Sequence, residues 1–98
     1  MRSRVVFRSG AREELAEAAG WYRSKSLVVT LAFRGAIRQT IERIAERPKS
    51  FVEVLPGIHR ALTPQFPYAI FFAEEKDAIV ILAVKHLPQD PATWPSRA

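Results

Sequence analysis

Cysteine is absent from this chain of 98 residues, which excludes disulfide bonds and thiolate metal ligands. The two histidines are too few for a histidine-based metal cluster, and we expect neither a metal nor another cofactor. No apolar run approaches the length of a membrane-spanning helix, and the first residues lack the pattern of a secretory signal. These absences predict a cytoplasmic protein.

Positive charge is in excess: fifteen Lys and Arg against ten Asp and Glu give a net charge of +5. A basic surface favours a nucleic acid, a ribosome or an acidic protein as partner. Hydrophobic residues make up 48% of the chain and charged residues 26%, as in folded proteins. Because so short a chain buries only a modest core, we expect a single domain over residues 1–98, with one sheet and one helical layer.

The chain begins with the pattern of a strand followed by a helix. The apolar residues at 5–7 predict the strand, and Ser9 is placed to cap a helix over residues 11–23. Glu13 and Glu14 lie near the predicted start of this helix, where the helix dipole favours negative charge.

A second helix follows the polar stretch 24–26, which offers a new cap and predicts a helical hairpin. Apolar residues recur at helical spacing over 29–44, and Pro48 ends the helix. Some apolar side chains fall outside the core stripes of the two helices, which indicates a surface covered by another molecule. They are Trp21, Leu27, Val28 and Leu31.

The second half of the chain predicts strands and then a tail. Two short extended pieces flank the Pro56-Gly57 turn, and two longer strands follow on either side of a polar turn at 74–77. The order reads β-α-α-β-β-β, an α+β fold with an N-terminal strand, an α-helical hairpin and a mostly antiparallel three-strand meander. We expect the first strand to join this meander at its edge. Three prolines predict that residues 87–98 form an extended C-terminal tail, anchored by Trp94.

Arg60 stands out because strand alternation places it on one face with Ile58 and Leu62. A guanidinium among apolar side chains needs a carboxylate, carbonyl groups or an external anion. Two alternatives are open: an internal ion pair with Glu53 or Asp90, or a role facing a ligand.

Several motifs, taken in order, resemble the RelE/ParE toxin superfamily, and the chain looks ParE-like. They are Trp21-Tyr22 at the end of the first helix, Pro48 after the long helix, Gly57-Ile-His-Arg60-Ala-Leu62, Phe66-Pro67-Tyr68-Ala-Ile, Ile81-Leu82-Ala83-Val84 followed by His86, and Asp90-Pro91-Ala-Thr-Trp94. The resemblance implies a toxin of a bacterial type II toxin-antitoxin module, neutralised by a partner protein. RelE-like members cut mRNA in the ribosomal A site, whereas ParE-like members act on DNA gyrase.

RNA cleavage by these residues would need a proton acceptor, a cation for the phosphorane and an acid for the leaving oxygen. The nuclease candidates are Arg60, Lys85, His86 and Tyr68, with His59 or Glu53 as further groups that could move protons. Two features oppose this reading: Leu87-Pro88-Gln89 stands where many members carry basic residues, and the late aromatic is Trp94, which cannot transfer the proton. The simplest roles for His86 and His59 are a bond to loop backbone and a place at the surface.

The resemblance therefore implies a non-enzymatic toxin that inhibits DNA gyrase by binding. The expected target contacts are Arg60, Lys85, His86, Trp94 and Arg97. The expected antitoxin contacts are Trp21, Leu27, Val28 and Leu31, which would meet an acidic, amphipathic tail in a hetero-oligomer. Two alternatives are a ribosome-dependent mRNA endonuclease of RelE type and an inactive relative that retains only antitoxin binding.

Overall fold

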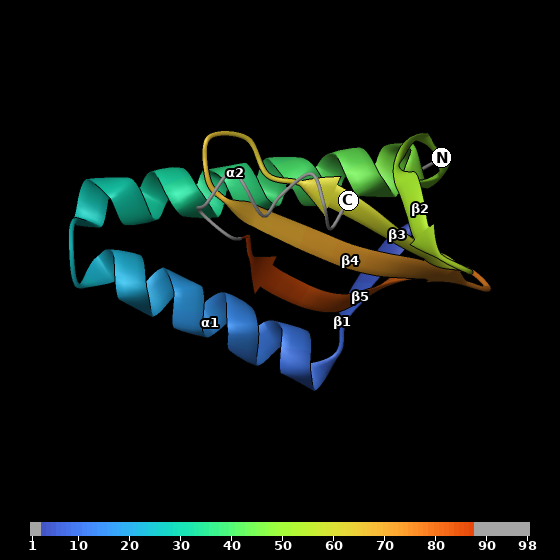
Figure 1. Ribbon diagram of the computed structural model, residues 1–98, viewed down its shortest axis with the longest axis horizontal. Coiled ribbons are helices and arrows are strands. Elements are labelled where there is room, and N and C mark those ends of the chain that lie inside the picture. Colours follow the sequence, from blue (N-terminus) through green and yellow to red (C-terminus); the bar gives the residue numbers. More distant parts are fainter. Residues whose placement is uncertain (1–2, 88–98) are drawn as a thin grey trace.

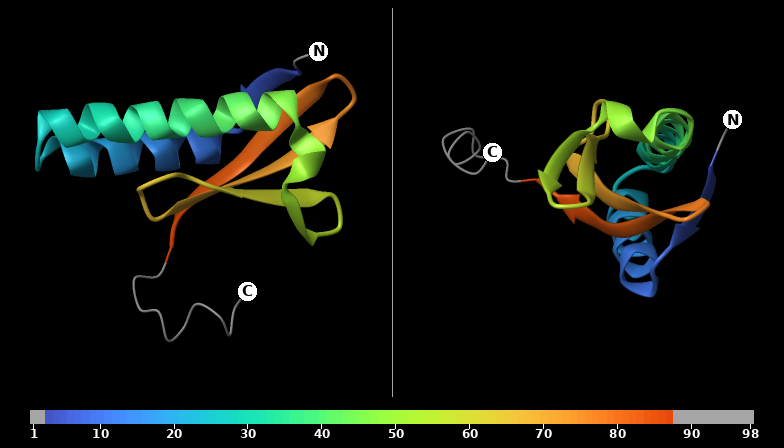
Figure 2. Two further views of the ribbon diagram at one scale, coloured as in Figure 1. Left: turned by 90° about the horizontal axis from the view of Figure 1, so that it is seen from above. Right: turned by 90° about the vertical axis from the view of Figure 1, so that its right-hand side faces the viewer.

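Two helices and a five-stranded sheet form the fold in this computed structural model, which describes residues 3–87 (Figure 1). Both helices lie on the same side of the twisted sheet, and no described helix covers its other face (Figure 2). The elements in chain order are β1 (Arg4–Phe7), α1 (Ser9–Arg23), α2 (Leu27–Glu46), a 3-10 turn (Pro48–Ser50), β2 (Val52–Leu55), β3 (Ile58–Leu62), β4 (Tyr68–Glu75) and β5 (Ala78–His86).

The sheet has the strand order β1-β5-β4-β3-β2. β1 lies parallel to β5 at one edge, and the other neighbouring strands are antiparallel. This arrangement confirms the α+β fold class and the edge position of the first strand. The meander has four strands instead of the predicted three, because both extended pieces beside Pro56-Gly57 pair as separate strands. Gly57 has a φ of +78°, a conformation that glycine adopts without strain.

The start of α2 follows the sequence, whereas the start of α1 does not. The Ser26 hydroxyl accepts a hydrogen bond from the Val29 N–H at 3.2 Å and so caps α2. Ser9 was expected to cap α1, but it is the first residue inside that helix, and the extended residue Arg8 takes the cap position without a side-chain bond. The dipole argument for Glu13 and Glu14 is also wrong, because the first turn of α1 holds no acidic residue.

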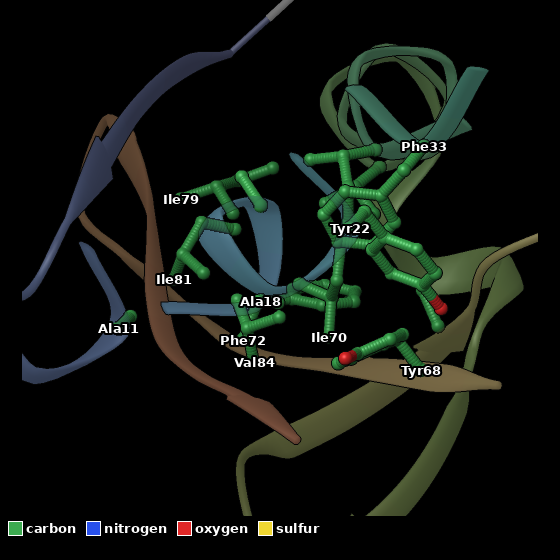
Figure 3. Close-up of a cluster of buried hydrophobic side chains, with 14 residues drawn as sticks. Ala11, Ala18, Tyr22, Phe33, Tyr68, Ile70, Phe72, Ile79, Ile81 and Val84 are labelled. Atoms are coloured by element: carbon green, nitrogen blue, oxygen red, sulfur yellow. The ribbon is translucent and has the colours of Figure 1, made fainter. Parts of the chain in front are cut away.

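The core lies between the two helices and the sheet face that they cover (Figure 3). Tyr22 from α1 and Phe33 from α2 meet Phe72 and other apolar side chains of the strands. The strand residues of this core that are fully buried are Ala61, Ile70, Phe72, Ile79 and Ile81. At about 25 cal/mol per Å² of buried apolar surface, these aromatic and aliphatic side chains dominate the stabilisation of the fold.

A β-bulge separates two neighbouring phenylalanines of β4. Phe71 pairs with Ala83, and Phe72 pairs with Ile81, so Leu82 of β5 is the extra residue. Phe72 is completely buried on the helix-covered face, while Phe71 is only half-buried. Strand alternation therefore places Phe71 on the helix-free face.

Candidate functional site

A groove of about 950 Å³ opens between α1, the corner that links β3 to β4, and the end of β5. Four residues singled out from the sequence line it: Trp21, Tyr68, Lys85 and His86. Two of them were expected to contact the target, one the antitoxin, and Tyr68 was a nuclease candidate. The structure therefore brings residues from all three predicted sets into one site.

The corner between β3 and β4 holds one wall of this groove in place. Thr63 is buried, and its hydroxyl donates hydrogen bonds to the carbonyl oxygens of Phe66 at 2.8 Å and Tyr68 at 3.2 Å. The Leu87 N–H donates to the Pro67 carbonyl oxygen at 2.7 Å, which ties the end of β5 to the same corner. Gln65 has a φ of 68°, a left-handed conformation that makes the corner tight.

Aromatic rings form the floor of the groove. The Tyr22 ring centroid lies 5.3 Å from that of Phe66 and 6.3 Å from that of Tyr68. Tyr22, Tyr68 and Phe33 lie together at one end of the core (Figure 3). His86 meets Tyr68 edge to face at 5.0 Å, so its ring packs on an aromatic side chain. Ring pairs in this geometry add to the stabilisation that burial alone provides.

Tyr68 is poorly suited to proton transfer at this position. Burial raises the pKa of its hydroxyl above the ordinary value of 10.0, and the nearby Tyr22 and Glu17 raise this pKa further. The phenol therefore stays protonated at neutral pH and is a weaker acid than a free tyrosine. The sequence allowed Tyr68 to act as an acid, whereas the structure makes it a packed residue of the groove floor.

Lys85 is already paired with an acidic residue of α1. Its ammonium group forms an ion pair with Glu14, whose carboxylate also accepts the Val84 N–H at 2.8 Å. Burial disfavours the charged carboxylate, but the bonds from Lys85 and Val84 outweigh it and hold the pKa of Glu14 below its ordinary value. The positive charge of Lys85 is thus largely compensated within the protein.

The predicted antitoxin contacts lie near the tip of the helical hairpin, and Trp21 also lines the groove. Trp21 is 57% exposed, and the ammonium group of Lys25 lies 5.3 Å from the centroid of its ring. Leu27, Val28 and Leu31 are 67%, 75% and 62% exposed at the start of α2. The structure thus shows that these four apolar residues are available at the surface.

Arg60 does not line the groove. Its neighbour Ala61 is completely buried in the core, so strand alternation turns Arg60 toward the helix-free face of the sheet. The expected ion pair with Glu53 is not formed, because Glu53 lies across the strands from His59 and accepts the Gly57 N–H at 2.7 Å.

Of the two histidines, His59 differs from its expected setting. His59 was expected at the surface, but it is half-buried and its ring centroid lies 5.4 Å from that of the core residue Phe72. Its Nδ1 atom is buried without a hydrogen-bond partner. His86 is exposed and its ring contacts the Tyr68 ring, while its expected bond to loop backbone stays a prediction. Asp90, Trp94 and Arg97 lie outside the described residues, as does all of the predicted tail beyond Leu87.

Sequence reasoning missed the acidic side of the groove. Glu14 and Glu17 both line it, and with Ala18 and Trp21 they recur at offsets of zero, three, four and seven along α1. Such spacing marks one face of a helix and places Glu14 and Glu17 beside Trp21, but it does not show that this face borders a groove with β5. The groove therefore combines aromatic walls with two carboxylates, one of which is paired with Lys85.

The arrangement suits binding better than catalysis. A nuclease reading requires Arg60 to act together with Lys85, His86 or Tyr68, yet Arg60 lies outside the groove that holds the other three. Of those three, Lys85 is ion-paired and Tyr68 is buried with a raised pKa. Within residues 3–87, no helix is long and apolar enough to cross a membrane.

Comparison with known proteins identifies relatives of this chain. The family described as the ParE toxin of the type II toxin-antitoxin system parDE matches residues 5–91. No curated protein matches the chain. A structure of the chromosomal ParDE toxin-antitoxin system from P. aeruginosa is 13% identical with a TM-score of 0.76, over 89% of this chain and 98% of that one.

Two structures of RelE from E. coli share the fold as well. The isolated RelE toxin is 11% identical with a TM-score of 0.58, over 97% of this chain and 95% of that one. A RelE mutant in complex with an antitoxin RelBc peptide is 14% identical with a TM-score of 0.60, over 100% of this chain and 96% of that one.

Proposed function

Because the chain belongs to the ParE toxin family of type II toxin-antitoxin systems, we propose that it stops bacterial growth by binding DNA gyrase in the cytoplasm, without cutting RNA. One observation carries the proposal: the groups that a nuclease would need are divided between two places. Tyr68, Lys85 and His86 line the groove, and Arg60 lies on another part of the sheet. General acid-base catalysis needs its groups within hydrogen-bond reach of a single reacting centre.

A supercoiling assay with purified gyrase tests this proposal directly. We expect the purified chain to inhibit supercoiling in a dose-dependent manner, and transcript ends mapped after induction to show no codon-linked cuts. Unaffected supercoiling together with codon-linked cuts would establish the RelE-like endonuclease instead. Absence of both effects and of growth arrest would identify an inactive relative.

We further propose that a cognate antitoxin neutralises the chain by covering the hairpin tip with an amphipathic, acidic segment. The exposed side chains of Leu27, Val28 and Leu31 offer an apolar surface, and Arg23 and Lys25 add positive charge beside it. An amphipathic helix binds such a surface through apolar residues at helical spacing. Acidic residues on the same helix would complement the net charge of +5.

Substitution of the exposed leucines tests this surface. We expect the double variant Leu27→Asp, Leu31→Asp to bind the antitoxin at least about tenfold more weakly, since it places charges in an apolar contact. Leu62→Asp is the matched control, because Leu62 is also exposed but lies on the helix-free face. Equal affinity of the double variant and the control, measured by calorimetry, would contradict the proposal.

A further inference from the structure

Arg60 lies at the centre of an apolar patch on the helix-free face of the sheet. The strand pairings place Val52 on one side of it and Phe71 on the other. Along β3, alternation places Ile58 and Leu62 on the same face. Val52 is 54% exposed and Leu62 47%, whereas Ile58 and Phe71 are half-buried. We call these five residues the Arg60 patch.

The Arg60 guanidinium lacks a partner among the described residues. Its Nε atom is fully buried and has no hydrogen bond. The salt bridges within residues 3–87 engage other cations, namely Arg8, Lys49 and Lys85. The cross-strand neighbours of Arg60 are apolar, and the carboxylate of Glu53 bonds to the Gly57 N–H.

A half-buried guanidinium without an acceptor is costly for the fold. An N–H group removed from water without a partner loses free energy that a hydrogen bond would restore. An apolar residue of similar volume in the same surroundings would be neutral or stabilising. Arg60 therefore does not serve the stability of residues 3–87, and its geometry points to an acceptor supplied from outside them.

The side chains around Arg60 indicate whether that acceptor is a nucleic-acid phosphate or a protein carboxylate. A nucleic-acid backbone is bound by several cations that neutralise successive phosphates. The patch offers one cation surrounded by four apolar side chains, two of them about half exposed. An arginine within a ring of apolar contacts that exclude water is typical of the centre of a protein interface. A carboxylate flanked by apolar side chains fits both parts of this surface.

We propose that the Arg60 patch is the anchor of the target interface and binds an aspartate or glutamate side chain that is flanked by apolar residues on the target protein. The inference rests on the proposed function, since it takes gyrase as the target. It adds the chemistry of the contact: the planar guanidinium binds the carboxylate, and Val52 and Leu62 pack against the flanking apolar groups.

The first experiment separates recognition from stability. Arg60→Met keeps the length of the side chain and removes its charge. We expect this variant to unfold at the same or a higher temperature. Its inhibition of supercoiling should nevertheless be weaker by a factor of about thirty or more. Arg34→Met, an equal loss of charge at an exposed position of α2, is the control and should inhibit like the unmodified chain. Full inhibition by Arg60→Met would overturn the inference.

The second experiment needs no gyrase and so separates the two proposals. In the full chain, the Arg60 Nε–H resonance is followed by NMR while the acetylated, amidated tripeptide Leu-Glu-Leu is added. We expect this resonance to shift in a saturable manner with the peptide, and not with Leu-Gln-Leu or with inorganic phosphate. If the unmodified chain fails to inhibit gyrase but this shift appears, the proposed target is wrong and the carboxylate site stands.

Other occupants of the patch give distinct results. A shift with phosphate and none with the Glu peptide would indicate an anion site for nucleic acid and overturn the inference. A changed Arg60 Nε–H resonance in free Asp90→Asn, with no response to the peptide, would assign the carboxylate to the chain itself and also overturn it. A third result would also overturn the inference: no probe shifts the resonance, and the unmodified chain and Arg60→Met inhibit gyrase equally well. Arg60 would then have no binding role.

Discussion

The two faces of the sheet differ in how deeply their side chains are buried. On the face covered by the helices, Phe72 and Ile70 are completely buried, and the buried Thr63 hydroxyl beside them has two acceptors. On the other face, Val52 is half exposed and the Nε atom of Arg60 has no acceptor. The Nδ1 atom of His59, whose ring lies beside Phe72, also lacks a hydrogen-bond partner, so the two faces differ mainly in how far their apolar side chains are exposed. This difference supports the proposal that the helix-covered face stabilises the fold, whereas the helix-free face binds a second molecule.

The largest expected effect tests the comparison at two adjacent residues. Phe72→Ala should lower the free energy of unfolding by about 3–5 kcal/mol, because it opens a cavity in the core. Phe71→Ala should cost less than half as much, since Phe71 is half-buried on the helix-free face. Urea denaturation of both variants measures the difference. Equal losses would mean that the two faces contribute alike to stability.

A smaller effect concerns the corner that supports the groove. Thr63→Val keeps the shape of the side chain but removes its bonds to the carbonyl oxygens of Phe66 and Tyr68, at a cost of about 1 kcal/mol. The loosened corner should also speed hydrogen exchange at the Leu87 N–H, which donates to Pro67. Thr40→Val is the control, because the Thr40 hydroxyl bonds within α2 to Ala36. Unchanged exchange at Leu87 would show that Thr63 does not support the corner.

The smallest effect is the pH dependence that Glu14 confers. Its pKa is held below the ordinary value of 4.5, so the folded state binds this proton less readily than the unfolded state. The stabilisation is therefore present above pH 4.5 and is lost as pH falls through the lowered pKa. We expect Glu14→Gln to remove about 1 kcal/mol or less at neutral pH. It should also flatten the acid side of the stability profile between about pH 6 and pH 3.

Glu13→Gln provides the control for this measurement, since Glu13 is exposed one position away on the same helix. Its profile should follow that of the unmodified chain. An unchanged acid limb in Glu14→Gln would contradict the role given to the carboxylate.

Features that depend on nearby residues could be predicted from the sequence. Ser26 caps α2 and Pro48 follows its end because capping and helix termination act within a few residues. Strand alternation correctly grouped Arg60 with Ile58 and Leu62. Ser9 failed as a cap because the chain leaves β1 in an extended conformation through Arg8, which places Ser9 inside the helix.

The groove could not be predicted because it depends on how α1 packs against β5. Glu14 and Val84 are separated by 70 positions, and nothing in the local pattern of either residue indicates their bond. The same packing places Trp21 and His86 in one groove, although the sequence suggested separate partners for them. Alternation grouped Arg60 with Ile58 and Leu62, but the face of the sheet on which they lie depends on where the helices pack in the whole fold.

The hydrogen bond between Glu14 and the Val84 N–H also affects the tendency of the toxin to aggregate. β1 pairs with β5 only as far as Ile81, so beyond that point the outer edge of β5 has no strand beside it in the described chain. An open strand edge can template pairing with another copy and start aggregation. The Glu14 carboxylate occupies one of the donors that an incoming strand would use, the Val84 N–H. One acidic side chain thus blocks part of the unpaired edge of β5, and protonating it would weaken that block.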